Sequence, residues 1–429
     1  MNHGAILSYR RFFLNKNRHA ACGGRGFSGT GTGLARGGFV FRRRNGGHSP
    51  EEAVPGHKDV AGTRCPGGGD REHGEASGRK KSREMERAFR AVFDLAPQTV
   101  KISGRRNRRK STIMDRYQGL LDFIRRDRPG REPEPVMISG DASFRKYYRY
   151  DGRIYVDAPP ETEKNAEFVR FSEIYNRSGV RVPKVYSCDL ENGYLCVEDF
   201  GDRMFSACLD GLEMEGMYLK AADVLQRLAG IGGAFTPFDA EFVRREDKIF
   251  TDWYLDAHMG RKLSGSDEKV WNRAVELFAA SCASQPQVTM HRDFHCRNIM
   301  VLDSGELGLV DFQDTVTGPL TYDLASLVRD CYITLPDELY QKLVERSYDG
   351  FVRSGILKDA SAAEFELALD LVATQRHLKA IGIFCRLLHR DGRNGYLQYL
   401  PRVFGYVRAA CGKHRQLEDL GILLEEKLL

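Results

Sequence analysis

The 429-residue chain lacks several features that define whole classes of proteins. No apolar run approaches the ~18 residues that a transmembrane helix needs. The N-terminus has no apolar core of the kind found in secretory signal peptides. The ten cysteines form no C-x-x-C pair, which argues against a disulfide scaffold and against a zinc ribbon. We therefore expect a protein of the reducing cytoplasm with no membrane partner.

Acidic residues are scarce in the first part of the chain. Residues 1–113 carry 24 Lys and Arg against 9 Asp and Glu, and they hold 19 of the 44 glycines. The segment shows neither helical nor strand periodicity, and it has too little apolar surface to offset the entropy of ordering. We interpret residues 1–113 as a disordered, basic, glycine-rich extension.

Two further hypotheses apply to this extension. Its arginine-rich runs at 42–44 and 105–110 are typical of segments that bind nucleic acid or an anionic surface. Regular helical periodicity begins just after Met114, so a start codon assigned too far upstream would also explain the change. We favour the upstream start over a functional tail, and we expect no nucleic-acid partner.

The remainder of the chain is long enough for two units with cores of their own. Helical periodicity at 115–126 precedes strand-like runs at 136–138, 144–150, 153–157 and 194–197. Further helices are predicted at 163–176, 214–228 and 363–389. We expect an α+β fold, with a small antiparallel β lobe at 114–205 and a mainly helical lobe at 206–429.

The most informative motif is His291-Arg292-Asp293, followed by Asn298 and, after a short hairpin, by Asp311. In kinases an H-R-D-x-x-x-x-N loop provides an Asp that accepts the substrate hydroxyl proton and an Asn that binds Mg²⁺. The hairpin should bring Asn298 and Asp311 to neighbouring strand ends, where their oxygens reach one metal ion. A lone loop aspartate usually forms a turn, but the triple spacing favours catalysis. We predict Asp293 as the catalytic base and Asn298 and Asp311 as Mg²⁺ ligands.

Phosphate contacts are predicted in the small lobe. The turn at 139–143 (SGDAS) would let backbone N–H groups approach phosphates, with Gly140 and Ser143 as nucleotide contacts, although a plain β-hairpin has the same pattern. The third strand, RIYVDAPP, lacks the lysine that protein kinases use there. Arg145 or Lys146 should supply the charge, and because side chains alternate along a strand only one of them can face the nucleotide.

An adenine contact is predicted where the strand at 194–197 ends. The residues there are Glu198-Asp199-Phe200-Gly201. In bilobal kinases the backbone of the equivalent hinge pairs with the adenine edge. We predict Glu198 and Phe200 as nucleotide contacts, with Phe200 covering an apolar ring face; an ordinary strand end with an acidic turn is the alternative.

Candidate substrate contacts lie in the helical lobe. They are Asp314, His295, Arg329, Arg376 and Trp253. Asp314 is interpreted as a substrate or second-metal contact, or as a turn former. Trp253 can stack on a sugar face, although a buried aromatic edge is more common. Arg376 would suit an acidic sugar, although basic residues on a helix are usually solvated. We interpret His291 and Asp323, in contrast, as structural braces of the catalytic loop.

Five segments carry a resemblance to a known family. They are GDASFRKYYR (140–149), DAPPE (157–161), HRDFHCRNIM (291–300), VDFQDTVTGPLTYDLASLVRDCYI (310–333) and QRHLKAIGIFCRLLHRDGRNGYL (375–397). The chain from about residue 114 onward resembles the aminoglycoside phosphotransferase/choline kinase superfamily, and in particular its bacterial anomeric sugar kinases. Cys296 departs from the serine expected there.

The resemblance implies a bilobal, protein-kinase-like fold with ATP and Mg²⁺ as cofactors. It also implies a small-molecule sugar substrate: N-acetylmuramate, N-acetylglucosamine or both, phosphorylated on the anomeric hydroxyl in cell-wall recycling. An aminoglycoside or another small amino alcohol is the alternative substrate, but a cationic antibiotic calls for an acidic pocket and the helical lobe offers Arg and His. A pseudokinase would lack Asp293, Asn298 or Asp311, and all three are present.

Overall fold

The structure is a computed structural model that describes residues 106–139, 144–209 and 213–428. Most of the predicted disordered extension therefore lies outside the described residues, and so do the predicted phosphate contacts Gly140 and Ser143. Among the helices that the structure describes, none is long and apolar enough to cross a membrane.

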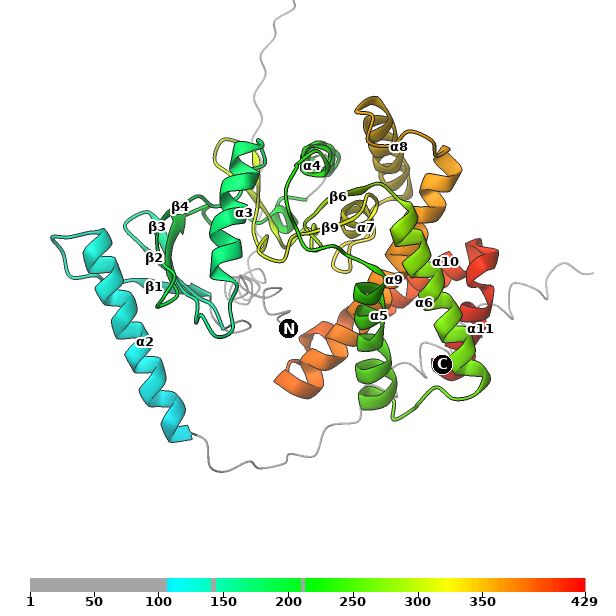
Figure 1. Ribbon diagram of the computed structural model, residues 1–429, viewed down its shortest axis with the longest axis horizontal. Helices are drawn as coiled ribbons and strands as arrows, with labels where there is room; N and C mark the ends of the chain where they lie inside the picture. The colour runs from blue at the N-terminus through cyan, green and yellow to red at the C-terminus, as the bar shows by residue number, and fades with distance from the viewer. Residues whose placement is uncertain (1–105, 140–143, 210–212, 429) are drawn as a thin grey trace, which may run out of the picture. The chain divides into compact units, whose positions relative to one another are not determined.

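A five-stranded antiparallel sheet, in the order β1-β2-β3-β5-β4, follows the first described helix (Figure 1). Its strands are β1 (Val136–Ser139), β2 (Lys146–Tyr150), β3 (Arg153–Asp157), β4 (Val185–Asp189) and β5 (Tyr194–Glu198). Four of them confirm the strands predicted from alternation. The sequence analysis did not predict β4, a strand of mixed polarity at the sheet edge.

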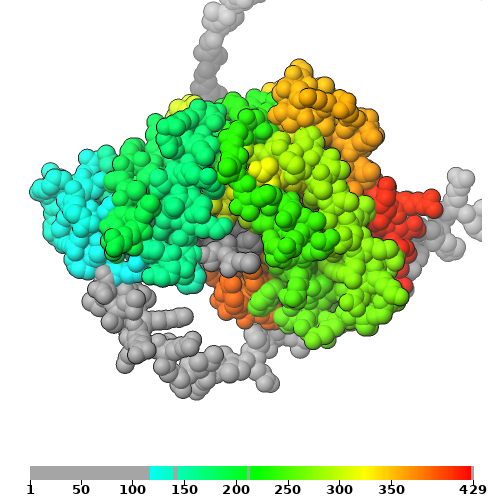
Figure 2. Space-filling model, viewed as in Figure 1, coloured from blue at the N-terminus to red at the C-terminus, as the bar shows by residue number. Residues whose placement is uncertain are grey.

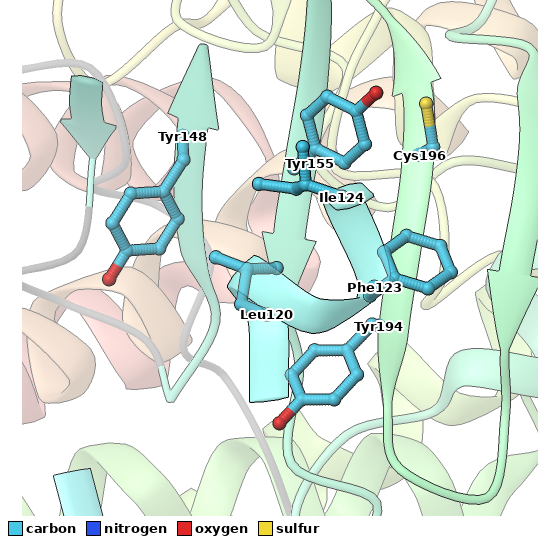
Figure 3. Close-up of a cluster of buried hydrophobic side chains, with 7 residues drawn as sticks. All are labelled: Leu120, Phe123, Ile124, Tyr148, Tyr155, Tyr194 and Cys196. Atoms are coloured by element: carbon cyan, nitrogen blue, oxygen red, sulfur yellow. The ribbon is translucent and has the colours of Figure 1, made fainter. Parts of the chain in front are cut away.

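Helix α2 (Arg106–Asp127) covers one face of this sheet. Figure 3 shows Leu120, Phe123 and Ile124 of the helix among Tyr148, Tyr155, Tyr194 and Cys196 of the strands, all of them buried. A buried side chain of this size contributes about 1.5–3 kcal/mol to folding. The helix begins earlier than the predicted residue 115, so the change in composition near residue 113 does not coincide with a helix boundary.

The second face of the sheet is turned toward α3 (Asn165–Arg177). This helix confirms the one predicted at 163–176. Ile154 and Val156 alternate with Tyr155 along β3, so they point away from α2. Phe168 of α3 contacts Phe312, with 4.6 Å between ring centroids, and the Tyr175 hydroxyl lies 2.7 Å from that of Thr315. These contacts connect α3 to the segment that follows the predicted catalytic hairpin.

Helices dominate residues 213–428. They are α4 (Glu213–Ala229), α5 (Ala240–Ile249), the π-helix η2 (Phe250–His258), α6 (Ser266–Ser284), α7 (Tyr322–Val328), α8 (Asp337–Arg353), α9 (Ala362–Asp391), α10 (Leu400–Lys413) and α11 (Glu418–Leu428). Short 3₁₀ turns lie at η1 (Phe205–Ala207), η3 (Asn394–Tyr399) and η4 (Arg415–Leu417). Helices α4 and α9 confirm the predictions at 214–228 and 363–389. On the face shown in Figure 2, α5 and α6 lie over much of α9.

The long helix α9 has clear start and stop signals. Ser361 and Glu364 form a capping box at its first turn, and Gly392 ends it in the left-handed region with φ of 68°. Most of its middle is buried, including the polar residues Arg376 and Lys379. A buried helix with inward-facing cations must find carboxylate partners, and these come from the loop and helices beside it.

Two small two-stranded sheets complete the fold. Strand β6 (Gln287–Met290) pairs with β9 (Val316–Pro319), and β7 (Ile299–Val301) pairs with β8 (Leu307–Leu309). The β7–β8 hairpin confirms the one predicted between the catalytic loop and Asp311. All of the predicted catalytic residues thus lie between β6 and β9 in the chain.

Candidate active site

The β7–β8 hairpin brings Asn298 and Asp311 together, as their spacing predicts. The Val310 amide donates to the Asn298 carbonyl at 2.9 Å, which extends the ladder by one pair toward the loop. The Asn298 Nδ2 donates to Asp293 O at 3.1 Å and to Asp311 Oδ2 at 3.4 Å. One buried amide therefore connects all three residues of the motif.

A cation would stabilise the carboxylates gathered here. Burial, followed by the charges of Asp293 and Asp314, raises the pKa of Asp311 well above its ordinary value, although Gln313 donates to its Oδ1 at 2.6 Å. The Asn298 nitrogen makes the hydrogen bonds to its neighbours, and no residue in the described part of the chain donates to its Oδ1. Carboxylate and amide oxygens are the ligands that Mg²⁺ prefers, so this donor set fits the predicted metal.

Asp293 differs from Asp311 in its electrostatic surroundings. Burial disfavours its charged form, but the cations Lys379, Arg376 and Arg292, together with His295, outweigh burial and hold its pKa below the ordinary value. The nearest of these contacts joins Arg376 Nη2 to Asp293 Oδ1 at 3.8 Å. The side chain of Asp293 is 23% exposed. Asp293 is therefore an accessible, ionised carboxylate at neutral pH, which is the form that accepts a proton.

Buried carboxylates fix the backbone of the catalytic loop. Asp323, in the first turn of α7, accepts hydrogen bonds from the amides of His291 and Arg292 at 2.6 and 2.9 Å. Asp330 accepts from the Cys296 amide at 2.9 Å. His291 Nε2 lies 3.1 Å from the Val310 carbonyl, and burial lowers the pKa of its ring to about 4. Asp323 and His291 thus make the backbone contacts that a brace of this loop requires, and their structural roles stay a prediction.

Lys146, the first residue of β2, and Arg145, which directly precedes the strand, point to opposite sides of the sheet. Tyr148 packs against α2, so Lys146, two residues earlier in the strand, points to that same side. Arg145 points the other way: its Nε lies 3.1 Å from Glu163 Oε2, and its charge lowers the pKa of Asp311. Of these two residues, the structure places Arg145 on the side of Asp311, one of the predicted metal ligands.

The two predicted adenine contacts make protein contacts through their side chains. The Glu198 carboxylate pairs with Arg181, with 2.6 Å between Nη2 and Oε1. Phe200 packs on Met300 of the β7–β8 hairpin. A Cβ on Gly308 would lie 2.4 Å from the Phe200 ring, so glycine permits this close approach. Contacts of this segment with adenine would therefore come mainly from its backbone, and they stay a prediction.

The predicted substrate residues do not all gather at Asp293. Arg376 lies beside it, and Asp314 lies close enough to raise the pKa of Asp311 while it accepts from Lys164 Nζ at 2.7 Å. His295 is buried against Tyr332, with 5.3 Å between ring centroids, and burial lowers its pKa to about 4.

The other two candidates face different surroundings. Arg329 places its guanidinium over the Tyr340 ring at 3.8 Å and near the Tyr406 ring at 5.4 Å. Trp253 is partly buried on η2. Their assignment as substrate contacts stays a prediction.

The sequence analysis missed an ion-pair network beneath the catalytic loop. Its centre is Glu246 of α5, which pairs with Arg292 and with Lys379. Glu246 lies in the run RREDK, a pattern typical of a solvated helix face. No local signal distinguishes the two buried carboxylates of this run, Glu246 and Asp247, from the exposed charges around them.

The chain is similar in sequence to known proteins. A family model described as "Phosphotransferase enzyme family" matches residues 136–355. The N-acetylmuramate/N-acetylglucosamine kinase of Pseudomonas aeruginosa is 36% identical over 297 residues, which cover 68% of this chain and 88% of the relative. The protein of the same name from Neisseria meningitidis serogroup B is 32% identical over 326 residues, covering 73% of this chain and 96% of its own.

One of two similar solved structures supports the predicted fold. The ethanolamine kinase of Plasmodium vivax matches with a TM-score of 0.50 and 14% identity, over 81% of this chain and 97% of its own. A choline/ethanolamine kinase family protein from Mesorhizobium loti matches with a TM-score of 0.49 and 14% identity, over 73% of this chain and 99% of its own. At this identity the likeness to the Plasmodium protein concerns the fold alone, and it agrees with the predicted kinase-like architecture.

Proposed function

Because the chain belongs to the phosphotransferase enzyme family, we propose that it transfers the γ-phosphoryl group of ATP to the anomeric hydroxyl of N-acetylmuramate, N-acetylglucosamine or both. The observation that carries the proposal is the site formed by Asp293, Asn298 and Asp311 in a chain that matches most of the length of two kinases with this pair of sugars in their names. The product would be a sugar 1-phosphate, formed in the recycling of cell-wall amino sugars in the cytoplasm.

The nucleotide would bind to the part of the chain before residue 206, and the sugar to the part after it. Asn298 and Asp311 would hold Mg²⁺, which when bound offsets the negative charge of the phosphates. Arg145, held by Glu163, would contact the phosphates as the lysine of protein kinases does. The backbone around Gly140 and Ser143 would approach the phosphates, and the backbone from Glu198 to Phe200 would pair with adenine.

Asp293 would orient the sugar's anomeric hydroxyl and take its proton as the oxygen–phosphorus bond forms. An anomeric hydroxyl is more acidic than an ordinary alcohol, so a carboxylate with a lowered pKa suffices as the acceptor. The hydrogen bond from Asn298 to the Asp293 carbonyl holds the proposed proton acceptor next to the proposed metal ligands. The proposed proton acceptor and the proposed metal ligands thus belong to one hydrogen-bonded unit.

The charge around Asp293 supports a sugar with acceptor groups over a cationic antibiotic. Arg376 is 4% exposed, and no described residue accepts a hydrogen bond from its Nε. A guanidinium with unused donors suits the acetamido carbonyl or the lactyl carboxylate of the proposed sugars. An aminoglycoside would instead bring its ammonium groups close to Arg376 and Lys379.

The test offers purified protein ATP and Mg²⁺ with N-acetylmuramate, N-acetylglucosamine, galactose or kanamycin, and locates the product phosphate by ³¹P NMR. We expect a 1-phosphate of at least one N-acetyl sugar. Asp293→Asn should lower kcat by about a thousandfold or more while ADP binding persists, because a proton acceptor is lost and the nucleotide contacts remain.

Asp303→Asn, an identical change at an exposed turn of the β7–β8 hairpin, is the matched control and should retain the wild-type rate. Transfer to kanamycin alone would favour the alternative substrate class. A fully active Asp293→Asn variant would contradict the assignment of the base.

A further inference from the structure

One buried carboxylate joins the catalytic loop to two helices. Glu246 of α5 is 2% exposed. Its Oε1 accepts from Arg292 Nη2 at 2.6 Å and from Lys379 Nζ of α9 at 3.0 Å. Its Oε2 accepts from the Tyr322 hydroxyl of α7 at 3.4 Å. All four side chains are buried, so each charge depends on the others for its compensation.

Arg292 is fixed at both ends by this arrangement. Asp323 holds its backbone amide, and its φ of 76° lies in the left-handed region, where a side chain costs about 1–3 kcal/mol unless neighbours support it. At the other end, Glu246 holds the guanidinium, which also lies 5.0 Å from the centroid of the Phe242 ring. The side chain of Arg292 is thereby directed toward α5.

Asp293 lies among the same cations. It follows Arg292 directly in the chain, and Arg376, one helical turn before Lys379 on α9, approaches it to 3.8 Å. Asp293 is thus next to Arg292 in the chain and in contact with α9 through Arg376, and the three cations favour its charged form. Without the Glu246 charge, Arg292 and Lys379 would be buried cations, and Asp293 is one of the carboxylates close enough to interact with both.

We propose that Glu246 is a positioning residue for phosphoryl transfer. It holds Arg292 and Lys379 through its own carboxylate, and this leaves the Asp293 carboxylate available to the acceptor hydroxyl. The inference rests on the proposed role of Asp293 as the proton acceptor. It differs from a purely structural role because it predicts that the balance of charge, and not the integrity of the fold alone, sets kcat.

Glu246→Gln removes the charge with little change in shape. We expect kcat to fall about tenfold to a hundredfold, because the acceptor becomes engaged by the released cations. The KM for ATP should change less than about twofold, since the proposed nucleotide contacts lie elsewhere. Glu246→Asp, which keeps the charge on a shorter side chain, should recover part of the rate.

The neighbouring acid offers a matched control. Asp247 is 1% exposed, and Gln375 Nε2 donates to its Oδ1 at 3.3 Å. Burial, followed by the charge of Glu246, raises the pKa of Asp247 well above its ordinary value, which favours the neutral carboxyl, and asparagine is close to that group in shape. Asp247→Asn should therefore keep kcat within about twofold of wild type if charge at Glu246 is what matters.

A charge-balanced double variant separates positioning from structure. Lys379→Met added to Glu246→Gln removes the released cation, so the double variant should have a higher kcat than Glu246→Gln alone. A double variant no faster than the single one would overturn the proposal, and so would an unchanged kcat in Glu246→Gln. If the wild-type protein phosphorylates none of the sugars, the proposed function itself fails, which is a distinct outcome.

Discussion

Gly382 is the point where α9 meets the backbone of another element. A Cβ built on this residue would lie 2.4 Å from the carbonyl oxygen of Ile249 and 2.8 Å from the amide nitrogen of Phe250, at the junction of α5 and η2. Ordinary contacts of a Cβ begin near 3.4 Å. Gly382→Ala therefore requires the two backbones to move about 1 Å further apart, and no rotamer change can provide this space.

Two opposing effects set the size of the change. Alanine in a helix interior is better than glycine by about 1 kcal/mol. Overpacking of a close-packed core costs about 1–3 kcal/mol or more, and here the obstacle is a backbone. We expect Gly382→Ala to lower the free energy of unfolding by about 1–2 kcal/mol, measured as a lower midpoint in urea.

The same change should reduce activity. Lys379 and Arg376 lie three and six residues before Gly382 on α9, or about 4.5 and 9 Å along its axis. A displacement of about 1 Å at catalytic groups can cost up to a hundredfold in rate, so we expect kcat to fall at least tenfold. Steady-state kinetics on the folded variant at a temperature well below its unfolding transition would measure this.

Gly405→Ala is the matched control, because Gly405 lies exposed within α10 and a Cβ there would meet nothing within 4 Å. It should raise the unfolding midpoint and leave kcat unchanged. A Gly382→Ala variant as stable and as active as Gly405→Ala would show that α9 does not approach the α5–η2 junction so closely, and the reasoning would fail.

Two further predictions concern acid stability and nucleotide affinity. Burial lowers the pKa of His377 from 6.5 to about 3. Between these pH values the unfolded chain binds a proton that the native state excludes. The free energy of unfolding should therefore fall as the pH drops below about 6.5 toward 3. His377→Gln keeps a donor for the Arg329 carbonyl, 2.8 Å away, and should flatten urea midpoints between pH 7 and pH 4; an unchanged slope would contradict this. Arg145→Met should raise the KM for ATP about tenfold and Lys146→Met should leave it nearly unchanged, whereas the reverse order would show that Lys146 faces the nucleotide.

Local spacing predicted the candidate site well. Asp293, Asn298 and Asp311 lie within one loop and one hairpin, so the short chain between them limits how they can be arranged. The strands at 146–150, 153–157 and 194–198 likewise follow from alternation and aromatic content. Strand β4 was missed because an edge strand with Ser, Cys and Asp lacks a clear alternation of apolar residues. The π-helix η2 was not predicted either, since it appears where α5 continues against α9.

The sequence by itself determined which chemistry this protein carries, because the catalytic motif is short and its geometry is set by neighbours in the chain. Only the tertiary structure decided how that motif is supported. Alternation allows either Arg145 or Lys146 to face the site, and the packing of α2 on Tyr148 selects Arg145. Glu246 and Lys379 are 133 residues apart, and no local pattern relates them. Their pairing exists because α5 and α9 pack together, and buried charges must be balanced wherever packing places them.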